Sequence, residues 1–512
     1  MKQLARGLDG AALVLAALAV AVLATGTVRL GAVALERPED LVVVIALLVG
    51  ARLAVAPLAL PRVSPRAVVA GGVVLYVLLM GVIVLTRHVA LRTHALDLGY
   101  YVQVVWSLAH GHGAYVTLPP MHAWGDHFSP VLYLFVPFGW LAPGAPALLL
   151  AQTVILAAGA VAIAGFAAHR LGDARLAAGF AVLYLLSPTV HGVNVRDIHP
   201  TVFAIPLLIA AAWAVDAGRP AWAALAVVLA LAGREDCAIA GVGFGIWLAL
   251  ARRRWRAGVG LAVACVALLW LDMNVLMPYF RGDAYPHLVK RYAYLGETLP
   301  EVLASMLVRP WRWMPVVFTL DKALYLVTML APLGFLPLAA PRAAAAALPG
   351  LALNLLSTDA FLIQFRTQYQ AFVLPFLMLA AVEGCAVLRE ATWWPRRLRV
   401  RTVMTAAVIV ALVLASRTAN DLGVRKWGLR PEHHAIHALL ARVPPRVPVS
   451  VNERLVPHLA TRAEVYVFPA GVERAAWVLD LETSIARADV SGFEVVARAT
   501  GWALLRRQDP SG

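Results

Sequence analysis

The sequence has few charged residues for its length. Of its 512 residues, 14% are charged and 61% are hydrophobic, whereas a soluble domain has about 25% charged and about 45–50% apolar residues. The apolar residues come in long uninterrupted runs, and a bilayer-spanning helix needs roughly 20 of them. The composition therefore excludes a water-soluble globular protein and predicts an integral membrane protein.

Cysteine is also scarce. The three cysteines, Cys237, Cys265 and Cys385, lie inside apolar runs, so the sequence offers neither a disulfide framework nor the thiolate spacing of a zinc site. No Gly-rich phosphate loop follows a strand, no His-Glu-x-x-His motif occurs and no nucleophile elbow is visible. These absences argue against nucleotide chemistry on the cytoplasmic side.

Acidic residues are fewer than basic ones, and the formal net charge is +15. In a soluble protein this excess would suggest nucleic acid as a partner. Here the basic residues lie mainly in short loops, and no basic stripe with interleaved aromatic residues occurs. We therefore expect no nucleic-acid partner and attribute the excess to membrane topology and contact with anionic lipids.

The apolar runs predict about thirteen membrane-spanning helices. We expect them near 11–30, 41–60, 67–90, 145–168, 176–193, 201–217, 220–233, 237–251, 257–275, 321–340, 343–357, 371–389 and 402–416. The first run could also be a signal peptide, but we favour a first span because more spans follow.

The loops between the runs alternate in arginine content. The arginine-rich set holds Lys2, Arg6, Arg62, Arg66, Arg170, Arg175, Arg219, Arg252–Arg254, Arg256, Arg342, Arg396, Arg397, Arg399 and Arg401. The positive-inside rule makes this set cytoplasmic. We expect a multi-pass protein of a bacterial cytoplasmic membrane, with a cytoplasmic N-terminus and an extracytoplasmic C-terminal part.

The stretch 220–251 tests this threading. One helix there would be about 48 Å long, too long to span, and the basic loops at Arg219 and Arg252–Arg254 must share a side. The chain therefore crosses twice, and Arg234–Asp236 lies at the recessed tip of a short outer hairpin. The same argument places Arg196–Pro200 at another outer tip.

Four regions follow from this threading. Residues 1–90 form the N-terminal transmembrane helices, and 91–144 form the first large outer loop, whose apolar stretch Pro130–Leu141 is too short to span. Residues 145–416 form the transmembrane core with an amphipathic outer loop at 276–320. In 417–512, alternating runs at Val447–Val451 and Glu464–Phe468 predict strands, and we expect a small outer α/β domain.

Asp97 follows the third predicted span, at the start of the first large outer loop. A carboxylate just outside a helix end can act as a general base towards a hydroxyl, a role worth about 10²–10⁴ in rate. Asp is also a favoured helix N-cap, and the apolar segment Leu98–Ala109 follows directly. Spacing alone leaves both interpretations open.

Asp126 and His127 place a carboxylate beside an imidazole. The pair could bind a divalent cation, orient a substrate hydroxyl or share a proton, or Asp126 could cap a helix that begins at Pro130. Together with Asp97 they are the candidate ligands of a divalent metal such as Mg²⁺ or Mn²⁺. The sequence does not decide whether a metal is required.

The two recessed hairpin tips carry six further candidates for a substrate cavity. An ionisable group at the bilayer centre costs roughly 2.5–3.5 kcal/mol, so these side chains must face a wet cavity or one another. A structural ion pair that clamps the bundle is the alternative. The candidates are Arg196, Asp197, His199, Arg234, Glu235 and Asp236.

Arg366 precedes the twelfth predicted span at the outer mouth, close to Gln368 and Tyr369, which we add to the cavity. A guanidinium there could hold a phosphate by paired hydrogen bonds, or it could reach outwards to lipid headgroups. Lys290 and Arg291, in the long outer loop, are weaker phosphate candidates and also fit a solvated basic face.

Several motifs together resemble a bacterial membrane-protein family known as domain of unknown function 2079. The matching motifs, in order, are Asp97–Trp106, Gly125–Pro130, Asp197–Pro200, Arg234–Asp236, Pro457–Arg462 and Val465–Pro469. The resemblance covers roughly residues 75–480. Ile198 and Arg234 depart from it, because relatives often have Phe and Lys there.

That family resembles the GT-C superfamily of polytopic membrane glycosyltransferases. These enzymes share a multi-helix bundle, an acidic residue in the first large outer loop and polyprenyl-phosphate sugar donors, and some bind a divalent metal. The resemblance implies an all-α polytopic membrane bundle with a small C-terminal extracytoplasmic α/β domain. It also implies that Asp97 is the catalytic base and that a basic residue, Arg366 first, holds the donor phosphate.

We therefore expect a glycosyltransferase that moves a sugar from a lipid-linked donor to a glycan, lipid or protein hydroxyl on the outer face. One alternative is a transporter or lipid flippase whose recessed acids and histidines form an ion path. Another is a non-catalytic envelope protein. The predicted cytoplasmic half is nearly devoid of acids, which favours an enzyme open on one side.

Overall fold

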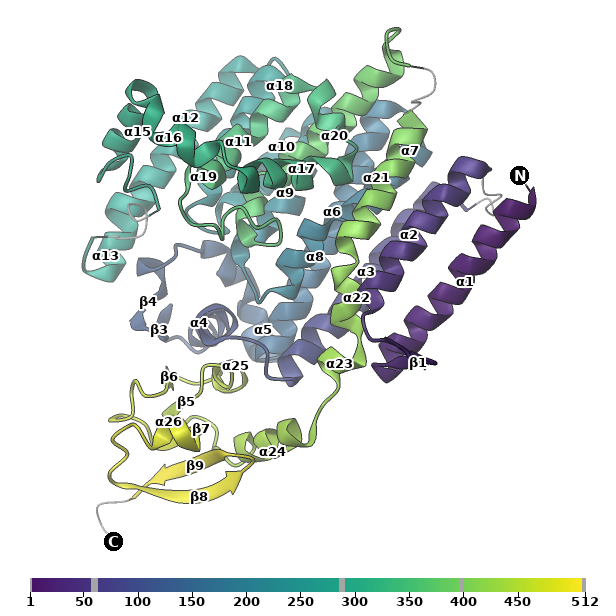
Figure 1. The fold of residues 1–512 in the computed structure, drawn as a ribbon. Coiled ribbons are helices and arrows are strands. Elements are labelled where there is room, and N and C mark those ends of the chain that lie inside the picture. Colours follow the sequence, from purple (N-terminus) through teal and green to yellow (C-terminus); the bar gives the residue numbers. More distant parts are fainter. Residues whose placement is uncertain (1, 57–62, 285–290, 396–399, 509–512) are drawn as a thin grey trace.

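The computed structural model describes residues 2–56, 63–284, 291–395 and 400–508. A helical bundle makes up most of the molecule, and a small sheet near the C-terminus lies against one end of it (Figure 1). The N-terminus lies towards the other end of the bundle, away from the sheet.

Two long helices begin the chain. Helix α1 (Lys2–Thr25) and helix α2 (Pro38–Val55) are joined by a hairpin of β1 (Val28–Leu30) and β2 (Val33–Leu35). The predicted first span, 11–30, therefore extends too far, because Gly26 adopts a left-handed backbone with φ 81° that ends the helix. Helix α3 (Pro65–Val89) follows and points towards the sheet end.

The predicted first outer loop is built from short elements. They are η1 (Ala95–Gly99), α4 (Tyr100–Ala109), β3 (Tyr115–Thr117), β4 (Pro120–His122), η2 (Ala123–Gly125), η3 (Pro130–Phe135) and α5 (Val136–Leu141). Element η1 is a single π-helical turn that continues into α4. The apolar stretch 130–141 is helical and too short to span, as predicted.

The remaining helices complete the bundle. They are α6 (Ala145–Leu171), α7 (Ala174–Leu185), α8 (Pro188–Val195), η4 (Pro200–Phe203), α9 (Ala204–Asp216), α10 (Pro220–Leu231), α11 (Cys237–Leu250), α12 (Trp255–Leu271), η5 (Asp272–Leu276), α13 (Met277–Arg281), α15 (Leu299–Val308), α16 (Pro310–Val317), α17 (Leu320–Leu330), η6 (Ala331–Leu333), η7 (Leu336–Ala339), α18 (Pro341–Ala344), η8 (Ala345–Ala347), α19 (Leu348–Leu356), η9 (Gln368–Phe372), α20 (Leu374–Glu390), α21 (Val400–Ala415), α22 (Arg417–Leu422) and α23 (Val424–Trp427).

Within the described residues, every predicted span coincides with one or more helices. By length and composition alone, four of these helices could cross a membrane. They are Gln3–Thr25, Pro65–Val89, Ala145–Leu171 and Trp255–Arg281. The number rises to six if two bent pairs each count as one span: α7 with α8, at 41°, and α16 with Leu320–Leu333, at 63°. The others, such as α10 and α11, are shorter.

Helix α6 is the centre of the bundle and packs against α3, α7 and α9. Its small residues permit close approach: a Cβ at Gly159 would lie 2.2 Å from the hydroxyl of Tyr184, which bonds to the carbonyl of Leu156 at 2.8 Å. Such packing through small residues is typical of helices that associate in membranes.

A network of ion pairs joins several helices at the C-terminal end of α6. The Arg252 guanidinium bonds to Asp216 at 2.5 and 2.7 Å and to Glu383 at 2.6 Å, and Arg170 bonds to Glu383 at 2.7 Å. Arg252 also lies 4.3 Å from the centre of the Trp247 ring. The acids Asp216 and Glu383 at this end are therefore paired with arginine.

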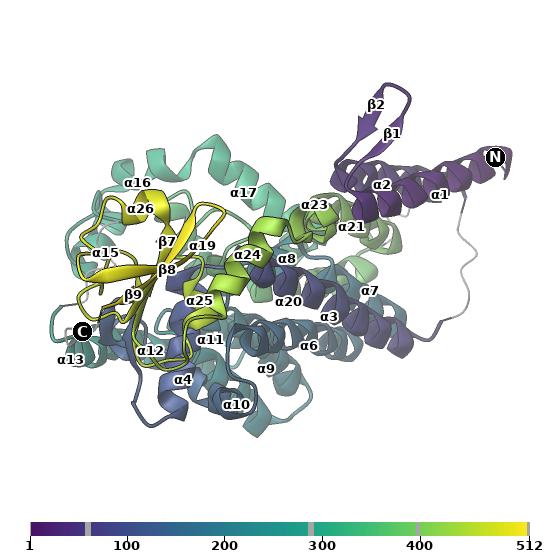
Figure 2. The same ribbon diagram turned by 90° about the horizontal axis from the view of Figure 1, so that it is seen from below.

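The C-terminal sheet has the order β6-β5-β7-β9-β8. Its strands are β5 (Val449–Val451), β6 (Val465–Val467), β7 (Trp477–Leu481), β8 (Phe493–Ala499) and β9 (Trp502–Arg507), and its helices are α24 (Pro431–Leu440), α25 (Val456–Leu459) and α26 (Glu482–Ile485). Strand β5 runs parallel to β6 and β7, whereas β9 is antiparallel to β7 and β8. The strands predicted at 447–451 and 464–468 are confirmed as β5 and β6. Figure 2 shows α24 and α25 over the sheet-facing end of α3.

Candidate functional site

Asp97 lies inside the π-helical turn η1. The N-cap of η1 is His94 and that of α4 is Gly99, and neither makes a side-chain capping bond. The interpretation of Asp97 as an N-cap is therefore wrong. Its side chain is 49% exposed, so the carboxylate is open to an incoming group.

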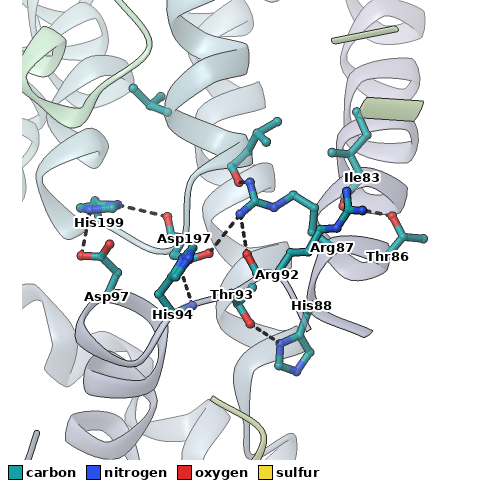
Figure 3. Close-up of polar contacts among 12 residues, drawn as sticks. Ile83, Thr86, Arg87, His88, Arg92, Thr93, His94, Asp97, Asp197 and His199 are labelled. Carbon is teal, nitrogen blue, oxygen red and sulfur yellow. Dashed lines mark hydrogen bonds and ion pairs between the residues drawn. The ribbon is translucent and has the colours of Figure 1, made fainter. Parts of the chain in front are cut away.

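His199 is the partner of Asp97. Its Nε2 lies 3.3 Å from Asp97 Oδ1, and the ring is buried (Figure 3). The Nδ1 atom lies 3.2 Å from the carbonyl oxygen of Asp197, and the backbone N–H donates to Gln152 Oε1 at 2.9 Å. Because a carbonyl only accepts, Nδ1 must carry a proton. In the neutral His199 ring Nε2 is therefore bare, whereas in the protonated ring Nε2 donates its proton to the Asp97 carboxylate, so the two groups can hold one proton between them.

The environment keeps Asp97 ionised. Burial raises the pKa of its carboxyl, but the hydrogen bond and charge of a protonated His199 outweigh burial, and His94 and His127 add to the effect. The pKa of Asp97 is therefore lowered from its usual value of 3.8.

Asp197 ties η1 to the tip that follows α8. Its Oδ2 accepts the backbone N–H of His94 at 2.9 Å and lies 3.3 Å from His94 Nδ1, while Oδ1 lies 3.8 Å from Arg87 (Figure 3). This bond to Asp197 raises the pKa of His94, against the smaller effect of burial. Arg87 also donates to the carbonyls of Val195 at 2.6 Å and Arg92 at 2.8 Å. The predicted residues Asp97, Asp197 and His199 thus form one connected group.

A second group joins the loop at 124–130 to the recessed hairpin between α10 and α11. Glu235 accepts from His127 Nδ1 at 3.0 Å and from the backbone N–H of Phe128 at 3.1 Å. Arg234 pairs with Asp236, with Nε 2.8 Å from Oδ1. The pKa of His127 is lowered by burial but raised more by Glu235, so the net direction is upward.

Asp126 follows η2 and is its C-cap. The N-cap of η3 is Ser129, so the interpretation of Asp126 as the cap at Pro130 is wrong. Asp97, Asp126 and Glu235 all lie close enough to the buried Tyr101 to act electrostatically on its hydroxyl. The two groups therefore border one site.

The described part of the chain contains no cluster of possible metal ligands. No three His, Cys, Asp or Glu side chains there are grouped so that they could hold a metal ion. The candidate ligands Asp97, Asp126 and His127 therefore do not form such a group.

Arg196, Arg366 and Arg417 lie close enough to act electrostatically on one another, and Arg196 also interacts with Asp97. We define these three residues as the arginine cluster. Burial and the charges of Arg87 and Arg417 lower the pKa of Arg196, and Asp97 acts in the opposite sense. Burial also lowers the pKa of Arg366, where Asp421 opposes it and Arg417 and Arg196 add to it. The cluster carries more positive charge than its acidic partners neutralise. It is therefore a candidate anion site.

The members of the cluster have few partners. Arg196 bonds to Gln364 at 3.3 Å and lies 4.9 Å from the centre of the Phe361 ring. Arg366 lies 3.4 Å from Asp421. Within the described ranges, Asp421 is the acid that forms an ion pair with the cluster.

The other predicted basic residues lie apart from this cluster. Arg291 donates to the Tyr369 hydroxyl at 2.8 Å and is 3.3 Å from Asp359. Gln368 lies in η9, and its Oε1 has no hydrogen-bond partner among the described residues. Lys290 lies outside the described residues.

The sequence did not single out Arg87, Gln152 or Arg417. Gln152 is a polar residue in an apolar span, which is a usable signal because such residues seldom face lipid. Arg87 lies in the last turn of a predicted span and Arg417 directly follows one. Both resemble ordinary helix-end cations, so only their position in the structure identifies them.

Comparison with known proteins places the chain in a family and a fold. Residues 87–498 match the family described as "Predicted membrane protein (DUF2079)". ArnT from Cupriavidus metallidurans bound to undecaprenyl phosphate shares the fold, with a TM-score of 0.52, 16% identity and coverage of 85% of this chain and 98% of that one. The apo state of the same protein gives a TM-score of 0.50 at the same identity and coverage. No curated protein matches the chain in sequence.

The family match covers most of the chain, including Asp97 and the partners that surround it. At 16% identity, the likeness to ArnT shows only that the two proteins share a fold. This chain is therefore a member of the DUF2079 family of predicted membrane proteins, with an ArnT-like fold.

Proposed function

We propose that the protein transfers a sugar from a polyprenyl-phosphate donor to an acceptor hydroxyl on the extracytoplasmic face of the membrane. One observation carries this proposal: a half-exposed, ionised Asp97 lies beside the buried His199 and borders the arginine cluster. The fold likeness to ArnT, which was solved with undecaprenyl phosphate, supports the donor class.

Asp97 acts as the general base. The acceptor hydroxyl gives its proton to Asp97, its oxygen forms a bond to the anomeric carbon, and the bond from that carbon to the phosphate oxygen breaks. The proton can then be shared with Nε2 of His199, which lies 3.3 Å away and is bare in the neutral ring. Such a role is worth about 10²–10⁴ in rate.

The arginine cluster holds the phosphate. Arg196 and Arg366 present guanidinium groups that can each form paired hydrogen bonds to phosphate oxygens. The negative charge that remains on the lipid phosphate as the sugar departs is stabilised by these fixed charges. Arg291 is a less suitable phosphate ligand because Asp359 and Tyr369 already engage it.

The recessed group lines the rest of the site. Asp126, His127, Glu235 and Asp236 would position the sugar or the acceptor, and no step requires a metal. We also propose the membrane topology that the sequence predicts. The chain would cross the membrane about thirteen times, with a cytoplasmic N-terminus and an extracytoplasmic C-terminal sheet.

The lipids that co-purify with the protein test the donor assignment. Mass spectrometry should find a polyprenyl-phosphate sugar with the wild-type protein and with Asp97→Asn. The Arg196→Gln/Arg366→Gln variant should retain much less of it. The matched control is Arg506→Gln, an exposed arginine on β9 that pairs with Glu494. Absence of this lipid from all samples, or equal amounts in all of them, would contradict the proposal.

A further inference from the structure

The segment after β5 lies directly against the turn that carries Asp97. Gly99, two residues beyond Asp97, is buried, and a Cβ at this position would lie 2.8 Å from Cγ1 of Val456. Val456 is fully buried. The sheet region therefore approaches η1 so closely that a side chain does not fit between them.

A second contact involves the chain just before η1. The ring of His458 stacks on that of His88, with centroids 3.9 Å apart and planes 10° apart. His437, on α24, meets His458 edge-on at 5.4 Å, and its Nε2 lies 2.7 Å from the carbonyl oxygen of Val89. His88 in turn bonds to Thr93 at 3.1 Å.

A third contact secures the chain after η1. Gln103, on α4, donates to the carbonyl of Ala463 at 3.0 Å, and the Thr117 hydroxyl donates to the carbonyl of Val465 at 2.5 Å. Helix α4 and strand β3 are thus bonded to the start of β6. The region of the C-terminal sheet therefore contacts the chain before η1, within η1 and after η1.

These contacts matter because η1 is a π-helical turn. A single π-helical turn is a local irregularity that persists where its surroundings hold it, and such turns often occur at functional sites. The Asp97 side chain is half-exposed, and among the described residues it forms an ion pair with His199. Its direction is therefore set by the backbone of η1.

We infer that the segment Val456–His458 is a positioning element of the active site, which holds η1 so that Asp97 reaches His199 and the acceptor hydroxyl together. This inference rests on the proposed glycosyl transfer for its catalytic consequence. Neither Val456 nor His458 contacts the reacting atoms. They act through η1.

The Gly99–Val456 contact allows a compensating test. Gly99→Ala should push η1 away from Val456, whereas Gly99→Ala/Val456→Ala removes Cγ1 and restores the room, since the next contacts are ordinary ones at 3.5 and 3.6 Å. Ala is the better helix former, so helix propensity would not explain a loss. Gly260→Ala, in α12 with open space around it, is the matched control.

The rates should separate positioning from stability. Gly99→Ala should lower kcat by up to about 10²-fold, as a misplacement of about 1 Å can, with an unchanged KM for the donor and an unchanged Tm. The double variant should recover most of the rate, and Gly260→Ala should match the wild type. A wild-type rate in Gly99→Ala, or a double variant as slow as the single one, would overturn the inference.

Hydrogen exchange gives a readout that does not depend on transfer. The backbone amides of residues 94–100 should exchange faster in Gly99→Ala and return to wild-type rates in the double variant. If the wild-type protein transfers no sugar, the proposed function fails while this exchange pattern still decides the positioning role. Equal exchange in all variants would overturn that role even if transfer is observed.

Discussion

At the scale of single residues, the site depends on how His199 is held. Its Nδ1 faces a carbonyl oxygen, its backbone N–H is bonded to Gln152, and its Nε2 faces Asp97. This arrangement fixes both the orientation of the ring and the place of its proton. In the proposed mechanism Asp97 is therefore a base whose pKa is lowered mainly by His199, with smaller effects of His94 and His127.

Replacing His199 should change the pH dependence of transfer. In His199→Gln the charge that lowers the pKa of Asp97 is lost while burial, which raises it, remains. The acid limb of the kcat profile should move to higher pH, because Asp97 must be ionised to act. His434→Gln, an exposed histidine on α24, should keep the wild-type profile, and so should His199→Gln if Asp97 is not the base.

The pair of His94 and Asp197 should stabilise the fold in a pH-dependent way. Because the pKa of His94 is raised above its usual 6.5, this contribution is complete below pH 6.5 and is lost as the pH rises through the raised value. The Tm deficit of His94→Gln relative to the wild type should therefore be larger at pH 6 than at pH 9. A deficit that is the same at both pH values would contradict this role.

Most individual site residues could be predicted from the sequence, whereas their pairing could not. Ionisable residues are costly in or near a membrane, which singles out Asp97, Asp197, His199 and Glu235. That His199 contacts Asp97 and His127 contacts Glu235 depends on helix packing between segments about a hundred residues apart. The N-cap interpretations failed because Asp97 and Asp126 lie in irregular turns.

At the scale of elements, the turns between regular helices carry the site. Asp97 lies in η1, Arg196–His199 follow α8, and Arg234–Asp236 connect α10 to α11. The helices are predictable because long apolar runs define them. A π-helical turn leaves no comparable pattern in the sequence, and it follows from the packing of the sheet region on Gly99.

The ion network at the other end of α6 should be essential for bundle stability. Glu383→Gln leaves Arg252 and Arg170 without one of their partners, and removing one member of a buried pair costs about 3–5 kcal/mol. Since Arg170 is partly exposed, the lower end of this range is expected. Glu390→Gln, an exposed acid on the same helix, should leave thermal unfolding in detergent unchanged. An equal Tm for both variants would show that the network does not stabilise the bundle.

At the scale of the whole molecule, Asp97 lies at the end of the bundle that faces the C-terminal sheet, because η1 packs against α25. A transporter would need a polar path to the other end, where Asp216 and Glu383 are bonded to arginine. The pairing of these acids with arginine therefore favours the proposed enzyme over a transporter. The proposed sidedness rests on the distribution of arginine among the loops.

Cysteine labelling should establish this sidedness. The native cysteines are buried, so new thiols at exposed positions report the side of the membrane. In intact cells a membrane-impermeant reagent should label Leu96→Cys and Asp489→Cys but not Arg219→Cys, whereas all three should react in broken cells. Labelling of position 219 alone in intact cells would reverse the proposed topology.

The rate of sugar transfer by Asp97→Asn tests the central claim most directly. With purified protein and a polyprenyl-phosphate sugar, this variant should bind the donor normally and transfer it about 10²–10⁴ times more slowly than the wild type. Asp283→Asn, an exposed aspartate after α13, should retain the wild-type rate. Transfer by Asp97→Asn at the wild-type rate would contradict the assignment of Asp97 as the catalytic base.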